Sequence, residues 1–378
     1  MKSLFISTLL AAALMGGQVF AATPTKVDGA TVDNKDFGVL AGVYGENAEA
    51  TGGQIHIYAD PSGRTDLLQY DIAGGFTYSE GMTASAYSNK LTMDSGEVLN
   101  LYGGLTANGD ANNNTVVVQG GTVASPGIVY GGCSSCFELT GTANNNVVII
   151  SGGNFQGGEV DGGFSVDGNA CGNRVHLVGR GAKGVGIADA DGKVGSYTGS
   201  SEGLQFTYVI GGWSGITGMD ATVEDNYIDI YGSGVKAQAI GGLDHLQFHL
   251  VESLDDTDPM LTLTSSMSVD ALNMNGIQLN LFGDAVTDWA AYAGESITLV
   301  QATQAIQGLT DGTEVDIKDA DGALLATATL TLGNSNKTLS LENIKGAGPT
   351  PGPVPEPTTG TLSLLALAAL AARRRKTA

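Results

Sequence analysis

Residues 114–132, NTVVVQGGTVASPGIVYGG, hold one complete unit of the pattern that decides the fold. An asparagine is followed by valines two and four positions later, then by a glycine turn, and a second apolar run ends in paired glycines. Apolar residues at every second position are typical of a β-strand with one buried face. The stretch therefore predicts two short strands joined by a tight turn.

This unit recurs along the middle of the chain. Its paired glycines are separated by 29, 28, 31, 49 and 30 residues and are Gly74-Gly75, Gly103-Gly104, Gly131-Gly132, Gly162-Gly163, Gly211-Gly212 and Gly241-Gly242. The aligned asparagines, each followed by apolar residues two, four and nine positions later, are Asn89, Asn114, Asn146, Asn173 and Asn226. Such a repeat predicts stacked coils that bury one continuous core, and the long interval predicts an insertion at about residues 192–208.

Three columns of aligned residues invite a structural interpretation. We expect the asparagines to lie at left-handed corners and to hydrogen-bond to one another along the stack. We assign the paired glycines to corners with positive φ. The residues just after the glycine pairs are Phe76, Leu105, Cys133, Phe164, Trp213 and Leu243, and we expect internal packing for them, with stacking on sugar rings as the alternative.

The unit Asn-x-apolar-x-apolar-x-Gly-Gly, closed by apolar-x-Gly-Gly, resembles the right-handed parallel β-helix of autotransporter-like adhesins and other pectin-lyase-like proteins. The resemblance spans about residues 38–245. It implies an all-β fold with parallel β-helix repeats (a β-solenoid) in residues 22–245. Alternating segments such as Leu246–Val251 and Ser296–Val300 predict terminal coils and a β-rich cap in residues 246–345. The resemblance implies a fold and not an activity.

The N-terminus has the order of parts of a secretory signal peptide. Lys2 supplies the positive charge, and the apolar run from Leu4 to Met15 is too short to span a bilayer. We place cleavage after Ala21, with Ala22 as an equal candidate, and expect signal peptidase as a partner. Residues 1–21 are therefore expected to be absent from the mature protein.

The C-terminus has three parts: a Gly/Pro-rich linker at 346–357, an apolar segment, and a basic end. Within 358–378, the apolar run Leu362–Ala372 precedes the basic cluster Arg373, Arg374, Arg375 and Lys376. With Pro355, Glu356 and Pro357 before it, this tail resembles the PEP-CTERM sorting signal of exosortase-processed bacterial proteins. The resemblance implies a short C-terminal helix with transient membrane contact, a sorting enzyme as partner, and a cell-envelope or extracellular location. A simple membrane anchor is the alternative, and whether the tail is cleaved stays open.

The composition excludes several functions. The formal charge is −22, and residues 22–355 hold 12 of the 17 basic and 38 of the 39 acidic residues, so the surface disfavours nucleic acid and anionic lipid. Charged residues make up only 15% of the chain, and 57 glycines accompany many β-branched residues, which favours strands and turns over disorder.

The three cysteines Cys133, Cys136 and Cys171 lie in glycine-rich β contexts. Export permits disulfides, and we predict one structural bond among the three, with the pairing open. The Cys133-Ser-Ser-Cys136 spacing lacks a second pair or a histidine that would complete a zinc site. Asp189-Ala-Asp191-Gly192 and Asp319-Ala-Asp321-Gly322 lack the downstream glutamate of a calcium loop and are interpreted as turns. We therefore expect no metal and no other cofactor.

No catalytic constellation is evident, because no histidine accompanies a GxSxG turn and no column of Asp or Glu repeats in the aligned strands. The least regular coil holds a basic group that is a candidate contact for an acidic glycan: Arg174, His176, Arg180 and Lys183. Trp213 of the aromatic column is a further candidate for glycan contact. The hypothesis is an exported structural or adhesive solenoid without catalysis. The alternatives are a polysaccharide lyase or glycoside hydrolase on the same fold and a cation-dependent assembly module.

Overall fold

The computed structural model describes residues 23–34, 38–46, 48–78, 84–134, 141–215, 221–252, 254, 258–265 and 272–347. The described residues up to Lys345 belong to one compact unit. The predicted signal peptide and the apolar helix and basic tail at 358–378 lie outside the described residues. Within the described ones, all regular structure is β apart from two 3-10 turns, η2 (Leu67–Gln69) and η3 (Trp289–Tyr292), and no helix is long and apolar enough to cross a membrane.

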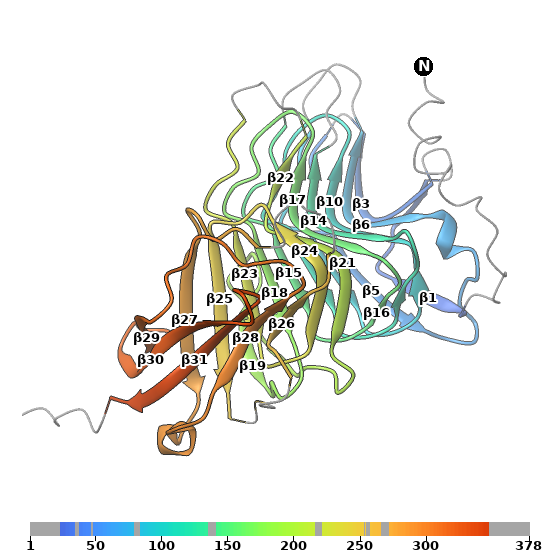
Figure 1. Cartoon of the computed structure of the whole chain (residues 1–378). Coiled ribbons are helices and arrows are strands. Elements are labelled where there is room, and N and C mark those ends of the chain that lie inside the picture. Colours follow the sequence, from blue (N-terminus) through green and yellow to red (C-terminus); the bar gives the residue numbers. More distant parts are fainter. Residues whose placement is uncertain are drawn as a thin grey trace, which may run out of the picture. The chain divides into compact units, whose positions relative to one another are not determined.

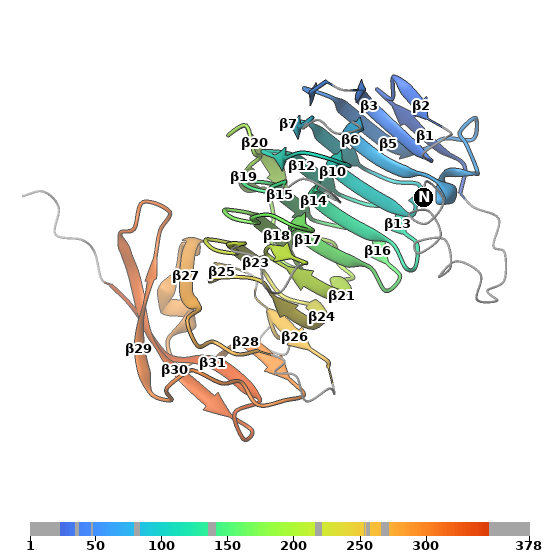
Figure 2. The same cartoon turned by 90° about the horizontal axis from the view of Figure 1, so that it is seen from above.

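The largest sheet has 23 strands and contains two long runs of parallel pairs (Figures 1 and 2). In the middle of the first run the paired glycines lie within the strands or directly beside them, whereas the first strand and the last two lack them. The strands of the first run are β3 (Val39–Glu46), β6 (Asp71–Tyr78), β10 (Asn100–Thr106), β14 (Ile128–Ser134), β17 (Glu159–Ser165), β21 (Leu204–Ile210) with β22 (Trp213–Ser214), β24 (Val235–Gly241), β26 (Leu261–Leu263) and β28 (Ile297–Ala302). Those of the second run follow the aligned asparagines or their equivalents: β5 (Gln54–Ala59), β8 (Lys90–Met93), β12 (Thr115–Val118), β15 (Val147–Ile150), β18 (Arg174–Val178), β23 (Tyr227–Tyr231), β25 (His245–Val251), β27 (Gln278–Ala285) and β29 (Thr313–Lys318).

Two small parallel sheets lie at the connections between these runs. One contains β4 (Ala50–Thr51), β7 (Ala86–Tyr87) and β11 (Ala111–Asn112). The other contains β9 (Glu97–Val98), β13 (Thr122–Val123) and β16 (Asn154–Phe155). In each small sheet, a strand therefore pairs with the equivalent strand of the preceding repeat.

Antiparallel strands accompany both ends of the parallel runs. β1 (Thr25–Asp28) pairs with β5, and β2 (Val32–Asn34) pairs with β3. β30 (Leu324–Gly333) pairs with β29, and β31 (Thr338–Gly346) pairs with β28. These strands pair with the first and last repeats, whose open backbone would otherwise invite pairing with other chains.

The predicted core positions are confirmed. The residues two and four positions after each aligned asparagine are at most 1% exposed: Leu91, Met93, Val116, Val118, Val148, Ile150, Val175, Leu177, Ile228 and Ile230. The repeat departs from the alignment at one place. Ala182, nine positions after Asn173, is buried in a separate cluster, and Leu204 stands beside Val235 because an inserted hairpin separates the two halves of this repeat.

The asparagine column forms the predicted ladder. The carboxamide nitrogen of each asparagine donates to the carboxamide oxygen of the next, at 3.0 Å from Asn89 to Asn114 and at 3.1 Å at the following three steps, as far as Asn226. The left-handed corner belongs to the preceding residue instead, since Asn113 and Asn145 have φ of +55° and +56°. The side chains of the aligned asparagines are fully or almost fully buried.

The explanation of the paired glycines by positive φ is wrong for all but Gly242, at +60°. Close approach explains the five pairs from Gly74-Gly75 to Gly211-Gly212 instead, whereas a Cβ on Gly241 would meet nothing within 4 Å. A Cβ on Gly103 would lie 2.3 Å from the carbonyl oxygen of Gly131, and one on Gly104 would lie 2.5 Å from the Asn114 carboxamide nitrogen. In these five pairs, the missing side chains leave room for the asparagine carboxamides and for the backbone of the neighbouring repeat.

Candidate functional site

The strongest cluster of titratable side chains lies on the outward face of strands β18, β23 and β25. Asp229 is 1% exposed, and its Oδ1 lies 3.0 Å from His249 Nε2. Its Oδ2 lies 3.5 Å from both Arg174 Nε and His176 Nδ1, and His176 Nδ1 is 3.2 Å from the Tyr231 hydroxyl. We call Arg174, His176, Asp229, Tyr231 and His249 the histidine cluster.

Parallel register creates this cluster. His176 and Asp229 are direct neighbours on β18 and β23, and Tyr231 and His249 are direct neighbours on β23 and β25. The residues between them along each strand, such as Leu177 and Ile230, point into the core. Sequence analysis singled out Arg174 and His176, but their partners come from repeats more than fifty residues later.

Stacked rings flank the cluster. Arg174 lies 4.2 Å from the ring centroid of Tyr227, which stacks on His245 at 4.1 Å. On the other side Tyr231 stacks on His249 at 4.0 Å, and His249 stacks on Phe282 at 4.8 Å. Ring spacings close to the strand separation allow each ring to support the next along the stack.

Burial and charge set the protonation states in the cluster. Burial lowers the pKa of His176 to about 4, so its imidazole is neutral at pH 7. Burial alone would raise the pKa of Asp229, but the nearby His176, His249 and Arg174 hold it below its ordinary value. Burial raises the pKa of Tyr231 far above its usual value. The Asp229 carboxyl group, 3.0 Å from His249 Nε2, fixes the orientation of the His249 ring.

The other two basic residues of the predicted group do not join the cluster. Arg180 pairs with Asp258, with Nη2 and Oδ2 2.5 Å apart, and Lys183 is exposed. The insertion predicted at about 192–208 is an antiparallel hairpin of β19 (Val185–Ala188) and β20 (Val194–Tyr197), and by Leu204 the chain has returned to the parallel sheet.

The inserted hairpin packs on the outward face of the sheet beside the histidine cluster. Its Ile187 and Tyr197 join Val117, Ile149 and neighbouring side chains in one buried group. Lys90 Nζ donates to Asp189 Oδ2 at 2.8 Å, and the backbone N–H of Ala190 donates to Thr115 Oγ1 at 3.0 Å. Asp189 to Gly192 is a tight turn, as predicted, with Gly192 at φ +79°.

Two members of the column that follows the glycine pairs, Phe164 on β17 and Trp213 on β22, form a second cluster with Tyr130, which precedes the glycine pair on β14. Tyr130 stacks on Phe164 with centroids 5.2 Å apart, and Phe164 stacks on Trp213 at 4.7 Å. We call Tyr130, Phe164 and Trp213 the ring ladder. Phe76 and Leu105 of the same column are buried, as internal packing predicts, whereas Trp213 is 40% exposed.

Two carboxyl groups that the sequence analysis missed lie on the same face as the ring ladder. Glu159 and Asp161 stand two residues apart on β17, and Asp161 is fully buried with no hydrogen-bond partner for its Oδ2. Burial raises the pKa of Glu159, and burial together with the Glu159 charge raises that of Asp161 well above its ordinary value. The sequence signal for these two carboxyl groups is a Glu-x-Asp pattern directly before a glycine pair, in a strand that does not follow an aligned asparagine.

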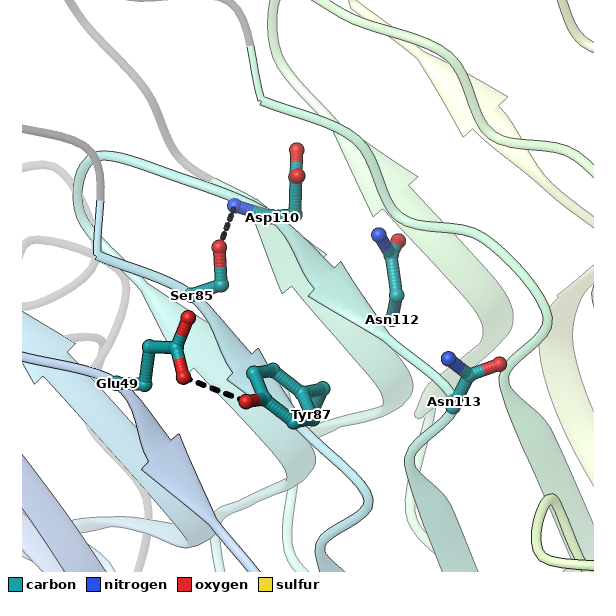
Figure 3. A pocket seen from close by; sticks show the side chains of 6 residues that line it. All are labelled: Glu49, Ser85, Tyr87, Asp110, Asn112 and Asn113. Atoms are coloured by element: carbon teal, nitrogen blue, oxygen red, sulfur yellow. Dashed lines mark hydrogen bonds between the residues drawn. The ribbon is translucent and has the colours of Figure 1, made fainter.

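A polar pocket of about 240 Å³ opens on the outer side of the β4–β7–β11 sheet (Figure 3). Its walls are Glu49, Ser85, Tyr87, Asp110, Asn112 and Asn113. The Tyr87 hydroxyl donates to Glu49 Oε2 at 2.5 Å, and the backbone N–H and hydroxyl of Thr142 both donate to Asp110 Oδ1. The pocket offers hydrogen bonds to a small hydroxylated molecule, and nothing in it supplies positive charge.

The remaining candidates do not form a metal or redox centre in the part of the chain that is described. There, no group of three or more His, Cys, Asp or Glu is arranged to hold a metal ion. Cys133 is buried on β14, and Cys136 lies outside the described residues. Cys171 carries a free thiol, which donates to the carbonyl oxygen of Thr222 at 3.3 Å. The disulfide stays a prediction.

Comparison with known proteins identifies the tail. Residues 353–376 match the PEP-CTERM protein-sorting motif, which includes the predicted Pro355-Glu356-Pro357 and the basic cluster. No curated protein and no solved structure matches the chain significantly. The motif indicates an exported, cell-envelope-associated protein that is sorted by an exosortase-like enzyme.

Proposed function

We propose that the region between the signal peptide and the sorting motif is a structural or adhesive module of the cell envelope or its surroundings, built as a right-handed parallel β-helix. One observation carries the proposal: the strand register and the asparagine ladder continue from repeat to repeat. The contacts between repeats hold the stack in a long, rigid shape, and solenoids of this kind present extended binding faces.

A second function has a specific observation in its favour. Glu159 and Asp161 have raised pKa values on one face of β17, and glycoside hydrolases need a carboxyl group that stays protonated near neutral pH. A glycan-active enzyme is therefore the alternative. Against it stands the complete burial of Asp161.

A panel of bacterial and host glycans separates these functions. The purified mature protein is passed over each immobilised glycan, and retention and released products are scored in the same samples. We expect retention without new reducing ends or unsaturated sugars. Released sugars would contradict a non-catalytic role, and Glu159→Gln and Asp161→Asn would then be the first variants to assay.

A further inference from the structure

The ring ladder ends in an exposed ring. Its ring planes are nearly parallel, at 11° between Tyr130 and Phe164 and 20° between Phe164 and Trp213. Phe164 and Trp213 are direct register neighbours, and their centroid spacing approaches the strand separation of roughly 4.8 Å. Tyr130 stands beside Asp161 in register, so its ring reaches Phe164 diagonally from the preceding repeat. Phe164 holds one face of Trp213, whose side chain is nevertheless 40% exposed.

The next repeat does not continue the ladder. Leu243 follows the next glycine pair and packs against the main core. The column therefore contributes no ring beyond Trp213, and none of its residues stacks on Trp213 from the next repeat. A planar group of similar size would extend the ladder by one step.

The surroundings of the ladder define the chemistry of such a group. Tyr208 is 40% exposed and lies opposite Glu159, across the β17–β21 pair, and Asp161 has an unpartnered carboxyl oxygen. No lysine or arginine occurs in β14, β17, β21 or β22. Aromatic faces carry negative partial charge and attract the polarised C–H face of a pyranose, while carboxylates accept hydrogen bonds from hydroxyls. An anionic ligand would find no positively charged side chain on these four strands.

We propose that Trp213 is the contact point for a neutral glycan, with one sugar ring stacking on its exposed face as the next member of the ring ladder. Tyr208 and Glu159 are neighbours on β21 and β17, five positions before Trp213 and Phe164. The proposal deepens the adhesive function and rests on it. It favours neutral over acidic glycans, in contrast to the acidic glycan expected for the basic group at Arg174.

Tryptophan fluorescence tests this contact directly, because the chain has only two tryptophans. Trp289→Phe in the full-length mature protein leaves Trp213 as the sole reporter, and it is titrated with cellohexaose, with chitohexaose as a second neutral probe and hexagalacturonate as the acidic one. We expect saturable changes in Trp213 emission with a neutral oligosaccharide and none with hexagalacturonate. Retention on the corresponding immobilised glycan should fall about tenfold or more for Trp213→Ala, as for a central contact residue, and recover for Trp213→Tyr.

Leu324→Ala is the matched control, since Leu324 is 46% exposed on a distant strand and should leave retention unchanged. Equal retention by Trp213→Ala with unchanged circular dichroism would overturn the proposal while leaving an adhesive function in place. Absence of any response to the two neutral probes would also overturn it, but not a purely structural role. Loss of self-association in Trp213→Ala would assign the ring to a second copy of the chain instead. Released sugars would contradict only the non-catalytic function.

Discussion

Removal of one rung should show how much the asparagine ladder contributes to stability. Asn146 is fully buried, accepts from the backbone N–H and the carboxamide of Asn114 at 2.9 and 3.1 Å, and donates to Ala111 O and Asn173 Oδ1 at 2.9 and 3.1 Å. Asn146→Ala deletes these four hydrogen bonds and leaves a buried backbone N–H without its acceptor. At about 1 kcal/mol per bond, the expected loss of unfolding free energy is about 4 kcal/mol.

Chemical denaturation followed by circular dichroism measures this loss, and hydrogen exchange locates it. Because each repeat contacts mainly its neighbours, faster exchange should concentrate in β12, β15 and β18. Asn154→Ala in the same repeat is the matched control: Asn154 is exposed, so the change should stay within about 0.5 kcal/mol. A loss below about 1 kcal/mol for Asn146→Ala, or exchange that rises evenly along the chain, would refute the ladder as a major stabilising element.

Three further perturbations test other parts of the structure. His176 has a pKa of about 4 in the folded protein, against 6.5 for a free imidazole. Its contribution to stability is therefore complete above pH 6.5, and about 3 kcal/mol of unfolding free energy should be lost as the pH falls toward 4. Chemical denaturation of His176→Gln across this pH range should show a weaker pH dependence than that of the natural protein. Gly104→Ala places a Cβ against the Asn114 carboxamide and should cost about 2 kcal/mol or more, whereas Gly241→Ala, with open space at that position, should be nearly neutral; equal melting temperatures for the two variants would contradict the close-approach explanation. Lys90→Ala removes the ion pair to Asp189 and should speed hydrogen exchange in the hairpin at 185–197 while global stability changes by less than about 1 kcal/mol; unchanged exchange there would show that apolar packing alone holds the hairpin.

The buried strand positions and the asparagine ladder can be predicted from the sequence alone. Alternation after each aligned asparagine was sufficient to predict the buried Val116, Val118, Val148 and Ile150, because a strand period of two leaves one face for the core. The ladder itself followed from the alignment of the asparagines. The reason for the glycines did not, because close approach of a neighbouring repeat depends on distances that one repeat cannot reveal.

The candidate sites depend on contacts between distant repeats, which explains what was missed. Arg174 and His176 stood out as basic residues in an irregular coil, but Asp229 and His249 become their neighbours only through the register of β18, β23 and β25. Arg180 and Lys183 appeared equivalent to them in sequence and lie elsewhere because the inserted hairpin begins just after them. Glu159 and Asp161 do not form an unbroken acidic column, because Asn100 and Ile128 stand between Glu159 and its equivalent Asp71, and Tyr130 stands beside Asp161.

Export of the chain and its sorting through the C-terminal motif can be measured by fractionation of producing cells, with intact mass of the recovered protein, for the natural chain and for a variant with Pro355, Glu356 and Pro357 changed to alanine. We expect the natural chain in the envelope or the medium, without residues 1–21, whereas the variant should keep residues 358–378 and accumulate in the membrane fraction. Recovery of the natural chain in the cytoplasm with both ends intact would show that it is neither exported nor sorted.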